Sequence, residues 1–160
     1  MSTQSKKSEE VVRQYAEGLS TLDLSKIATI LAPEFKFSYR LDHIWSGHGI
    51  TTDVRYIGHL YKTFTAMKSE GVTEIKTGFC ELEYQGVKFL SIKLFPPHDR
   101  RILFPGDFVC VEQSRARLPM GEAILFPRVK EGVLHKVECF VEFRQFTEYH
   151  RGKVLSEFVP

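Results

Sequence analysis

The loop expected at residues 41–48 carries the densest group of side chains that could do acid–base chemistry. It contains a carboxylate, Asp42, next to an imidazole, His43, with the indole of Trp45 and a second imidazole, His48, close behind. A carboxylate that holds one tautomer of a histidine gives a base that works near neutral pH, and an aromatic wall shields such a base from water. Neighbours in sequence can also point apart, and the same residues then form an exposed loop with Trp45 anchored on the core. We take Asp42 and His43 as candidate catalytic residues and Trp45 as a candidate ligand-binding residue.

Further polar side chains are expected on the elements around this loop. Tyr56 and His59 lie three residues apart on the flank of a helical apolar stripe, so both could line a pocket or form a satisfied edge of the core. Tyr39 ends an alternating strand. His135 is expected to share a strand face with apolar residues, as a pocket group or as a hydrogen-bonded core histidine. We consider Asp42 or His135 as the proton-transferring group, and Tyr39 or Tyr56 as a hydrogen-bond donor to a ligand oxygen.

Motifs for other chemistries are missing from the sequence. It has no HExxH arrangement, no glycine-rich phosphate loop and no GxSxG elbow. His43 and His48 stand five residues apart without a third ligand, and the cysteines are widely spaced inside apolar runs. We therefore predict no metal site, no cofactor, and free thiols at Cys80, Cys110 and Cys139.

The composition is that of an ordinary globular protein. The 160 residues suit one domain, with 42% hydrophobic and 26% charged residues. A net charge of +2, with scattered basic residues, does not favour a nucleic-acid partner. The N-terminus is polar, and no run approaches the ~20 apolar residues of a membrane span. We expect no membrane partner and a reducing, cytoplasmic compartment.

Two helices are expected before the first strand. After a disordered lead-in at residues 1–7, Ser8 is expected to cap a helix because acidic residues follow it in the first turn. The apolar face of this helix recurs at helical spacing, at Val11, Tyr15, Leu19 and Leu22. Asp23 or Ser25 can cap a short second helix, which Pro33 stops.

A third helix is expected between the first strand and the remaining strands. Thr51 or Thr52 caps it, Gly71 follows its end, and its apolar stripe consists of Val54, Ile57, Leu60, Phe64 and Met67. The remaining segments are typical of strands: residues 35–39, 74–84, 87–95, 108–118, 123–129 and 133–143. Residues 144–160 contain too many apolar anchors for a solvated end, so we predict that this extension packs on the body or on a partner: Phe146, Tyr149, Leu155 and Phe158.

Helices followed by antiparallel strands define an α+β domain over residues 8–143. Several stretches of this domain resemble the NTF2-like superfamily, which includes SnoaL-like polyketide cyclases, ketosteroid isomerases and scytalone dehydratases. LAPEFKFS at 31–38 resembles the end of the second helix and the first strand, and SGHGI at 46–50 resembles the turn into the third helix. The closing meander is matched by GDFVCVE at 106–112, GE at 121–122 and KEGVL at 130–134. The resemblance implies an NTF2-like cone, with about three N-terminal helices packed on a curved, mainly antiparallel sheet and a pocket at its open end.

Such a cone implies a small apolar or aromatic molecule as the partner. Cofactor-independent acid–base catalysis of the cyclase, dehydratase or isomerase type is one use of the pocket. The isomerases of this superfamily place a catalytic aspartate at the end of the first strand, where this chain has Tyr39. That departure argues against isomerisation of the steroid type.

The alternative is a non-catalytic interaction domain that uses the outer face of the sheet. Phe140 is expected to project from the polar side of the last strand, among Lys136, Glu138 and Glu142, with Phe126 and Ile124 beside it. One large aromatic inside a charged rim is typical of an interface core, so we predict a homodimer over this face. The sequence leaves both classes open.

Overall fold

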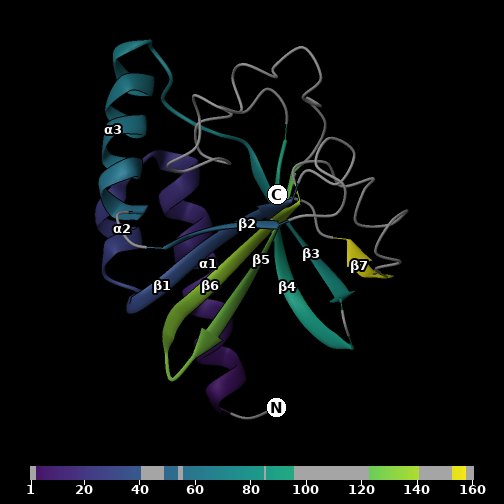
Figure 1. Cartoon of the computed structure of the whole chain (residues 1–160). Coiled ribbons are helices and arrows are strands. Elements are labelled where there is room, and N and C mark those ends of the chain that lie inside the picture. Colours follow the sequence, from purple (N-terminus) through teal and green to yellow (C-terminus); the bar gives the residue numbers. More distant parts are fainter. Residues whose placement is uncertain are drawn as a thin grey trace.

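One sheet with helices on one of its faces makes up the described part of the chain (Figure 1). The computed structural model describes residues 3–40, 49–53, 56–84, 86–95, 123–140 and 153–157. The helices are α1 (Thr3–Thr21), α2 (Leu24–Ala28) and α3 (Tyr56–Ser69). The strands are β1 (Leu31–Arg40), β2 (Gly49–Asp53), β3 (Thr77–Tyr84), β4 (Val87–Leu94), β5 (Ala123–Lys130), β6 (Val133–Phe140) and β7 (Lys153–Glu157).

The strand order in the sheet is β2-β1-β6-β5-β4-β3-β7. Neighbouring strands run antiparallel except β1 and β6, which are parallel. The predicted α+β class, with N-terminal helices on a curved and mainly antiparallel sheet, is confirmed. In the C-terminal extension, β7 pairs with β3, with Leu82 opposite Val154. The expected strand at 108–118 and the anchors Phe146, Tyr149 and Phe158 lie outside the described residues.

Helix α1 begins at Thr3, so the prediction of an N-cap at Ser8 is wrong, and residues 3–7 belong to the helix. Glutamine and lysine are good helix formers, and no proline or glycine interrupts residues 3–8, so the helix extends through them. Asp23 caps α2, where its Oδ1 accepts hydrogen bonds from the backbone N–H and the hydroxyl of Ser25, at 3.1 and 2.6 Å.

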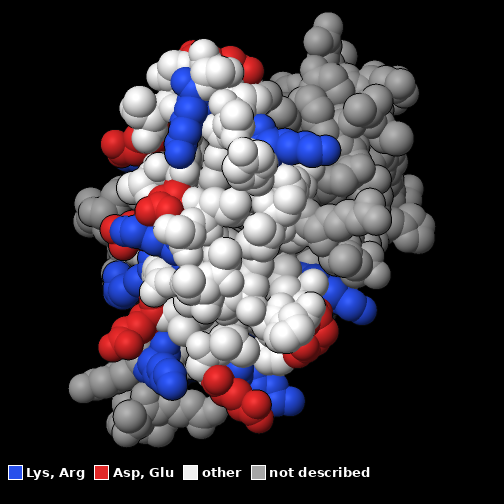
Figure 2. Space-filling model, turned by 90° about the vertical axis from the view of Figure 1, so that its left-hand side faces the viewer, with Lys and Arg blue, Asp and Glu red and all other residues white. Residues whose placement is uncertain are grey.

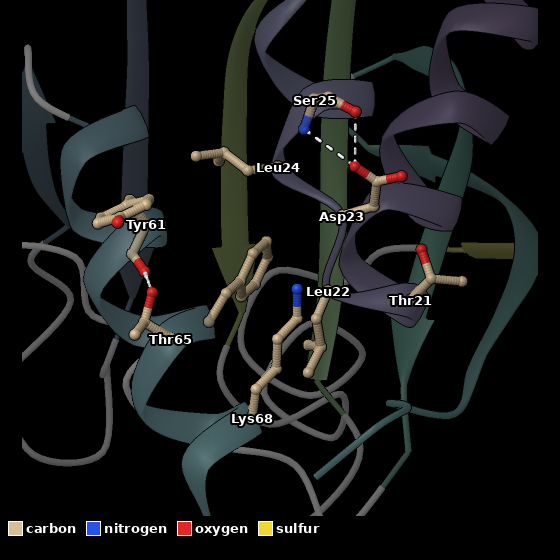
Figure 3. Close-up of a pocket in the computed structure, with 9 residues that line it drawn as sticks. Thr21, Leu22, Asp23, Leu24, Ser25, Tyr61, Thr65 and Lys68 are labelled. Atoms are coloured by element: carbon tan, nitrogen blue, oxygen red, sulfur yellow. Dashed lines mark hydrogen bonds between the residues drawn. The ribbon is translucent and has the colours of Figure 1, made fainter.

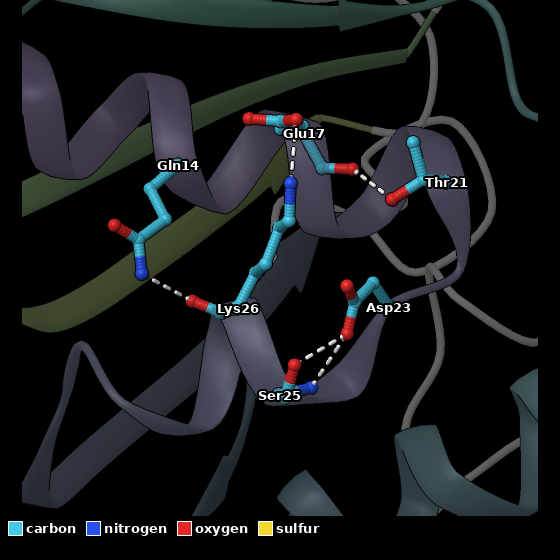
Figure 4. Close-up of polar contacts among 6 residues, drawn as sticks. All are labelled: Gln14, Glu17, Thr21, Asp23, Ser25 and Lys26. Carbon is cyan, nitrogen blue, oxygen red and sulfur yellow. Dashed lines mark hydrogen bonds and ion pairs between the residues drawn. The ribbon is translucent and has the colours of Figure 1, made fainter.

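The corner between α1 and α2 is held by a set of polar contacts (Figure 4). The Gln14 side chain donates to the Lys26 carbonyl at 2.8 Å, and the Lys26 ammonium forms an ion pair with Glu17. Gly18 makes the corner possible, because a Cβ there would lie 2.6 Å from Cγ1 of Ile27. The two helices are therefore fixed against each other at close range.

Strand β1 is longer than predicted, and β2 was not predicted. Pro33 lies within β1, in the irregular stretch between Leu31 and Lys36 where the pairing with β6 shifts, so its missing N–H breaks no ladder bond there. The residues expected to cap the third helix, Thr51 and Thr52, belong instead to β2, which pairs with β1. Threonine is β-branched and favours a strand, and the helix begins later, at Tyr56.

The helix-facing side of the sheet forms the larger core. It combines apolar residues of α1, α2 and α3 with alternate residues of the strands, such as Val137 and Cys139 of β6. Leu134 belongs to the same core although it lies three residues before Val137, because the register of β6 with β5 shifts at this point. The predicted alternation of β6 therefore fails at His135, which is not among the core residues.

A second apolar cluster covers the other face of the sheet. It consists of Cys80, Leu82, Tyr84, Phe89, Ile124, Phe126 and Phe140. The rings of Phe126 and Phe140 pack edge to face with centroids 5.6 Å apart, and both side chains are 0% exposed. The prediction that Phe140, Phe126 and Ile124 form an exposed patch is wrong, because all three are buried within the chain itself.

Candidate functional site

A pair of buried tyrosines forms the most unusual polar feature of the helix-facing core. The hydroxyls of Tyr15 and Tyr56 lie 2.6 Å apart in a hydrogen bond, and the two side chains are 0% and 5% exposed. The rings of Phe35 and Phe37 pack on Tyr56 at centroid distances of 4.9 and 5.2 Å, the second nearly parallel to it. The two phenol groups therefore sit in surroundings that are otherwise largely aromatic and aliphatic.

Local structure explains why these side chains meet. Tyr15 lies one helical turn from Leu19, on the buried face of α1. Tyr56 is the first residue of α3 and shares its buried face with Leu60. Phe35 of β1 lies across the layer from both helices, and the antiparallel partner of β1, β2, leads the chain back toward α3.

Both phenols are held in their neutral form. Burial raises the pKa of Tyr15 well above its usual value, and the nearby Tyr56 adds to that rise. Burial also raises the pKa of Tyr56, against the smaller opposing effect of its hydrogen bond with Tyr15. Two hydroxyls that share one hydrogen bond use one proton between them, so the second proton can be donated to another oxygen. The pair can donate hydrogen bonds at neutral pH but cannot act as a base there.

Cys139 lies close to this tyrosine pair and is also neutral. Burial raises the pKa of its thiol, and the adjacent Glu138 carboxylate raises it further. A thiol kept protonated is a poor nucleophile, so we assign Cys139 to the wall of the site. Cys80 and Cys139 are free and buried; Cys110 lies outside the described residues.

The other predicted polar residues are placed at different points of the fold. Tyr39 is paired through its backbone with Ile50 of β2 and Cys139 of β6, at the level of the tyrosine pair. His59 is half-buried on α3, three residues after Tyr56. Asp42, His43, Trp45 and His48 lie outside the described residues.

His135 lies beside Glu34 at the start of β6. Its Nδ1 lies 3.1 Å from Oε1 of Glu34, whose side chain is 64% exposed. Both residues occupy irregular stretches of the sheet, where β1 and β6 shift register. Four residues separate His135 from Cys139, which is about 13 Å along a strand. The structure therefore brings Tyr56 together with Tyr15, and it places His135 at the other end of β6 from them.

Tyr15 was expected only as a member of an apolar helix face. Its signal in the sequence is a hydroxyl-bearing ring among aliphatic residues at helical spacing, which requires a buried partner. Nothing in the sequence alone identifies that partner, because Tyr56 follows 41 residues later.

Within the described ranges, no group of three histidine, cysteine or acidic side chains could hold a metal ion. No helix in those ranges is long and apolar enough to span a bilayer.

The fold and the site together define an α+β domain. Helices cover one face of its curved, mainly antiparallel sheet, and a pair of phenols lies in the layer between the helices and the sheet. The helices and the sheet are arranged as the resemblance to the NTF2-like superfamily implies, whereas the phenol pair was not part of that expectation. No protein-family model and no curated protein matches the sequence.

Solved structures that are similar to the chain include three with different descriptions. A protein of unknown function with a cystatin-like fold from Methylobium petroleophilum PM1 has 13% identity and a TM-score of 0.49, over 84% of this chain and 75% of that one. An LEH-like epoxide hydrolase from M. tuberculosis has 10% identity and a TM-score of 0.45, over 94% and 89%. A ketosteroid isomerase-like protein from Kribbella flavida DSM 17836 has 16% identity and a TM-score of 0.41, over 84% and 77%. The assignment of the fold rests on the elements and pairings described above.

Proposed function

We propose that this chain is a small-molecule-binding protein with an NTF2/SnoaL-like pocket, and that an oxygen of its apolar or aromatic ligand accepts a hydrogen bond from the Tyr15–Tyr56 pair. The observation that carries this proposal is the pair itself. The two buried hydroxyl oxygens lie 2.6 Å apart, and their mutual hydrogen bond uses only one of the two hydroxyl protons. An ordinary core could hold phenylalanine at both positions at nearly no cost, because replacing both partners of a buried hydrogen bond by apolar groups of the same shape is close to neutral.

The chemistry that suits such a donor is stabilisation of charge on oxygen. Preorganised donors in a water-poor site stabilise an oxyanion that develops in a transition state. Because burial keeps both phenols protonated, they remain donors across the neutral range. The proposed activity is therefore cofactor-independent acid–base catalysis of the cyclase, dehydratase or isomerase type.

A base must come from elsewhere. We propose Asp42, with His43 beside it, because Arg40 ends β1 two residues earlier and Tyr39 lies level with Cys139 at the tyrosine pair. Trp45 is proposed as an apolar wall, and Tyr39 and His59 as further ligand contacts. His135 is the alternative base, held by Glu34.

A ligand screen with matched tyrosine variants tests the proposal. Aromatic polyketides, steroids and terpenoids are screened by thermal shift against the wild-type chain, and the affinity of each hit is then measured for Tyr56→Phe and for Tyr84→Phe. Tyr84 is the matched control because it is also a buried tyrosine, 3% exposed, but belongs to the cluster on the other face of the sheet. Loss of one donor to a buried ligand oxygen is worth about 1–3 kcal/mol, so Tyr56→Phe should weaken binding roughly ten- to hundredfold. Equal affinities for the two variants would contradict the proposal.

We also propose a cytoplasmic homodimer. Two buried free thiols fit a reducing compartment. Because Phe126 and Phe140 are buried within the chain, a dimer must use a different surface from the predicted patch. Sedimentation equilibrium gives the mass directly, and a monomer at micromolar concentration would exclude the dimer.

A further inference from the structure

A groove of about 520 Å³ lies on the helical side of the molecule, between α3 and the corner where α1 leads into α2 (Figure 3). It is separate from the tyrosine pair, because neither Tyr15 nor Tyr56 lines it. Its lining residues on α3 begin at Tyr61, five residues after Tyr56, and extend to Lys68. Its volume is within the range of small-molecule sites.

The floor of the groove is apolar. Leu22 and Phe64 form it and are almost fully buried, and the half-buried Leu24 extends it. Leu22 has a φ of 56°, a left-handed conformation that is strained for a branched side chain. This conformation closes α1, with the Asp23 N–H donating to the Gly18 carbonyl at 2.9 Å, and turns the following residues toward α3.

One wall of the groove is a single face of α3. Tyr61, Phe64 and Lys68 follow one another at spacings of three and four residues, so their side chains point the same way. Of these, Tyr61 offers exposed aromatic surface to a flat ligand, while Phe64 lies beneath it in the floor. Figure 3 shows the Lys68 side chain reaching from α3 toward Leu22 across the groove.

The other polar groups around the groove are already occupied. The Thr21 and Thr65 hydroxyls donate to carbonyls of their own helices, and the Asp23 carboxylate accepts two hydrogen bonds from Ser25. Among the described residues, in contrast, the Lys68 ammonium makes no ion pair and no hydrogen bond. Within the described part of the chain, the groove therefore presents an unpaired cation beside an apolar floor.

The surrounding surface carries charges of both signs. Figure 2 shows this side of the molecule, where uncharged atoms form a band down the face, basic side chains lie across its upper part, and acidic and basic side chains are mixed along its left and lower edges. Asp23 is the acidic residue that lines the groove, and the charge of Lys26, which itself pairs with Glu17, lies close to it. These charges balance one another overall, so the feature that favours a negatively charged ligand is the ammonium of Lys68, which is unpaired among the described residues.

We propose that this groove binds a flat aromatic carboxylate, whose rings lie on Leu22 and Phe64 beside Tyr61 and whose carboxylate meets Lys68. The site lies outside the proposed pocket at the tyrosine pair and does not depend on it. It gives the chain a second binding function, for an acidic aromatic metabolite.

The test is a ¹H–¹⁵N NMR titration of the full chain with 2-naphthoate, alongside neutral 2-naphthamide and cationic 2-naphthylmethylamine. At about 0.3 kcal/mol per heavy atom, naphthoate should bind with a Kd on the order of 1 mM. Shifts should map to residues 21–25 and 61–68, and affinity should fall as salt is raised.

Two lysine variants test whether the binding of naphthoate depends on the charge of Lys68. Lys68→Gln should weaken naphthoate binding about two- to fivefold, as expected for a partly exposed ion pair. Lys62→Gln is the matched control, because Lys62 is exposed on the same helix but does not line the groove. The proposal is overturned by shifts that never saturate, by equal weakening in both variants, or by tighter binding of the amine than of naphthoate. Neither Tyr15 nor Tyr56 takes part, so a failed pocket proposal leaves this result unaffected.

Discussion

Removing the two hydroxyls of the tyrosine pair singly and together should give strongly non-additive losses of stability. In Tyr15→Phe, the hydroxyl of Tyr56 stays buried and loses its partner, which lies 2.6 Å away in the wild type. A buried polar group left without a partner costs about 1–3 kcal/mol. Tyr56→Phe should cost a similar amount, because it leaves the Tyr15 hydroxyl in the same position.

The double variant should recover much of this loss. Replacing both partners by apolar groups of the same shape is close to neutral, so Tyr15→Phe/Tyr56→Phe should be less destabilised than the sum of the single variants by about 1–2 kcal/mol. Tyr61→Phe is the control, since an exposed ring should change stability by less than about 0.5 kcal/mol.

Urea unfolding followed by circular dichroism measures the free energies of unfolding of the wild type and of all four variants, provided that the slope with denaturant is unchanged. Additivity within about 0.5 kcal/mol would refute the coupling, and with it the claim that the two hydroxyls form one buried unit.

Three further predictions concern how pH and substitutions at buried positions change the stability of the chain. Burial raises the pKa values of Tyr15, Tyr56 and Cys139 above their usual 10.0, 10.0 and 9.0, so the folded chain keeps protons that the unfolded chain releases. These neutral groups contribute their full stability below pH 9, and the contribution is lost as the pH rises above their usual pKa values, by up to about 1.4 kcal/mol per pH unit and group. Because the double variant Tyr15→Phe/Tyr56→Phe lacks two of these groups, its urea midpoints should fall less steeply between pH 8 and 11 than those of the wild type. Gly18→Ala should destabilise the folded chain by about 1–3 kcal/mol, because the added Cβ would meet Ile27. Gly58→Ala should stabilise it by about 0.5–1 kcal/mol, because no atom lies within 4 Å of the added Cβ. Thermal melts that rank the two variants the other way would contradict the close contact between α1 and α2. Phe140→Asp should unfold the chain by burying a charge rather than release monomers, and a folded, monodisperse variant in gel filtration and circular dichroism would show that Phe140 is not in the core.

Elements with strong local patterns were the predictable ones. The strand expected at residues 123–129 is β5, Ala123–Lys130, and the cap at Asp23 is one of the two that were considered. Both depend on period and side-chain type within a few residues. The order of helices before strands was enough to predict the α+β class.

Features that depend on distant residues were not predictable. Strand β2 exists through its pairing with β1, and the shift of His135 out of the core depends on how β6 meets β5. The tyrosine pair joins α1 to α3 across 41 residues, which no local pattern records. Phe140 resembled an exposed aromatic because its neighbours in β6 are charged, yet Tyr84 and Phe126, which pack on its ring, come from other strands.

The parallel pairing of β1 with β6 has a consequence for how the chain reaches this structure. Phe37 of β1 lies opposite Val137, so this contact joins segments about 100 residues apart. At about 5–20 residues per second, a ribosome needs some 5–20 s to synthesise the segment between them. During that time β1 lacks its central neighbour, and the apolar faces of α1 and α3 lack the strand that completes their core. Such long-range closure slows folding and exposes strand edges to other chains, so the nascent protein should depend on chaperones until β6 emerges.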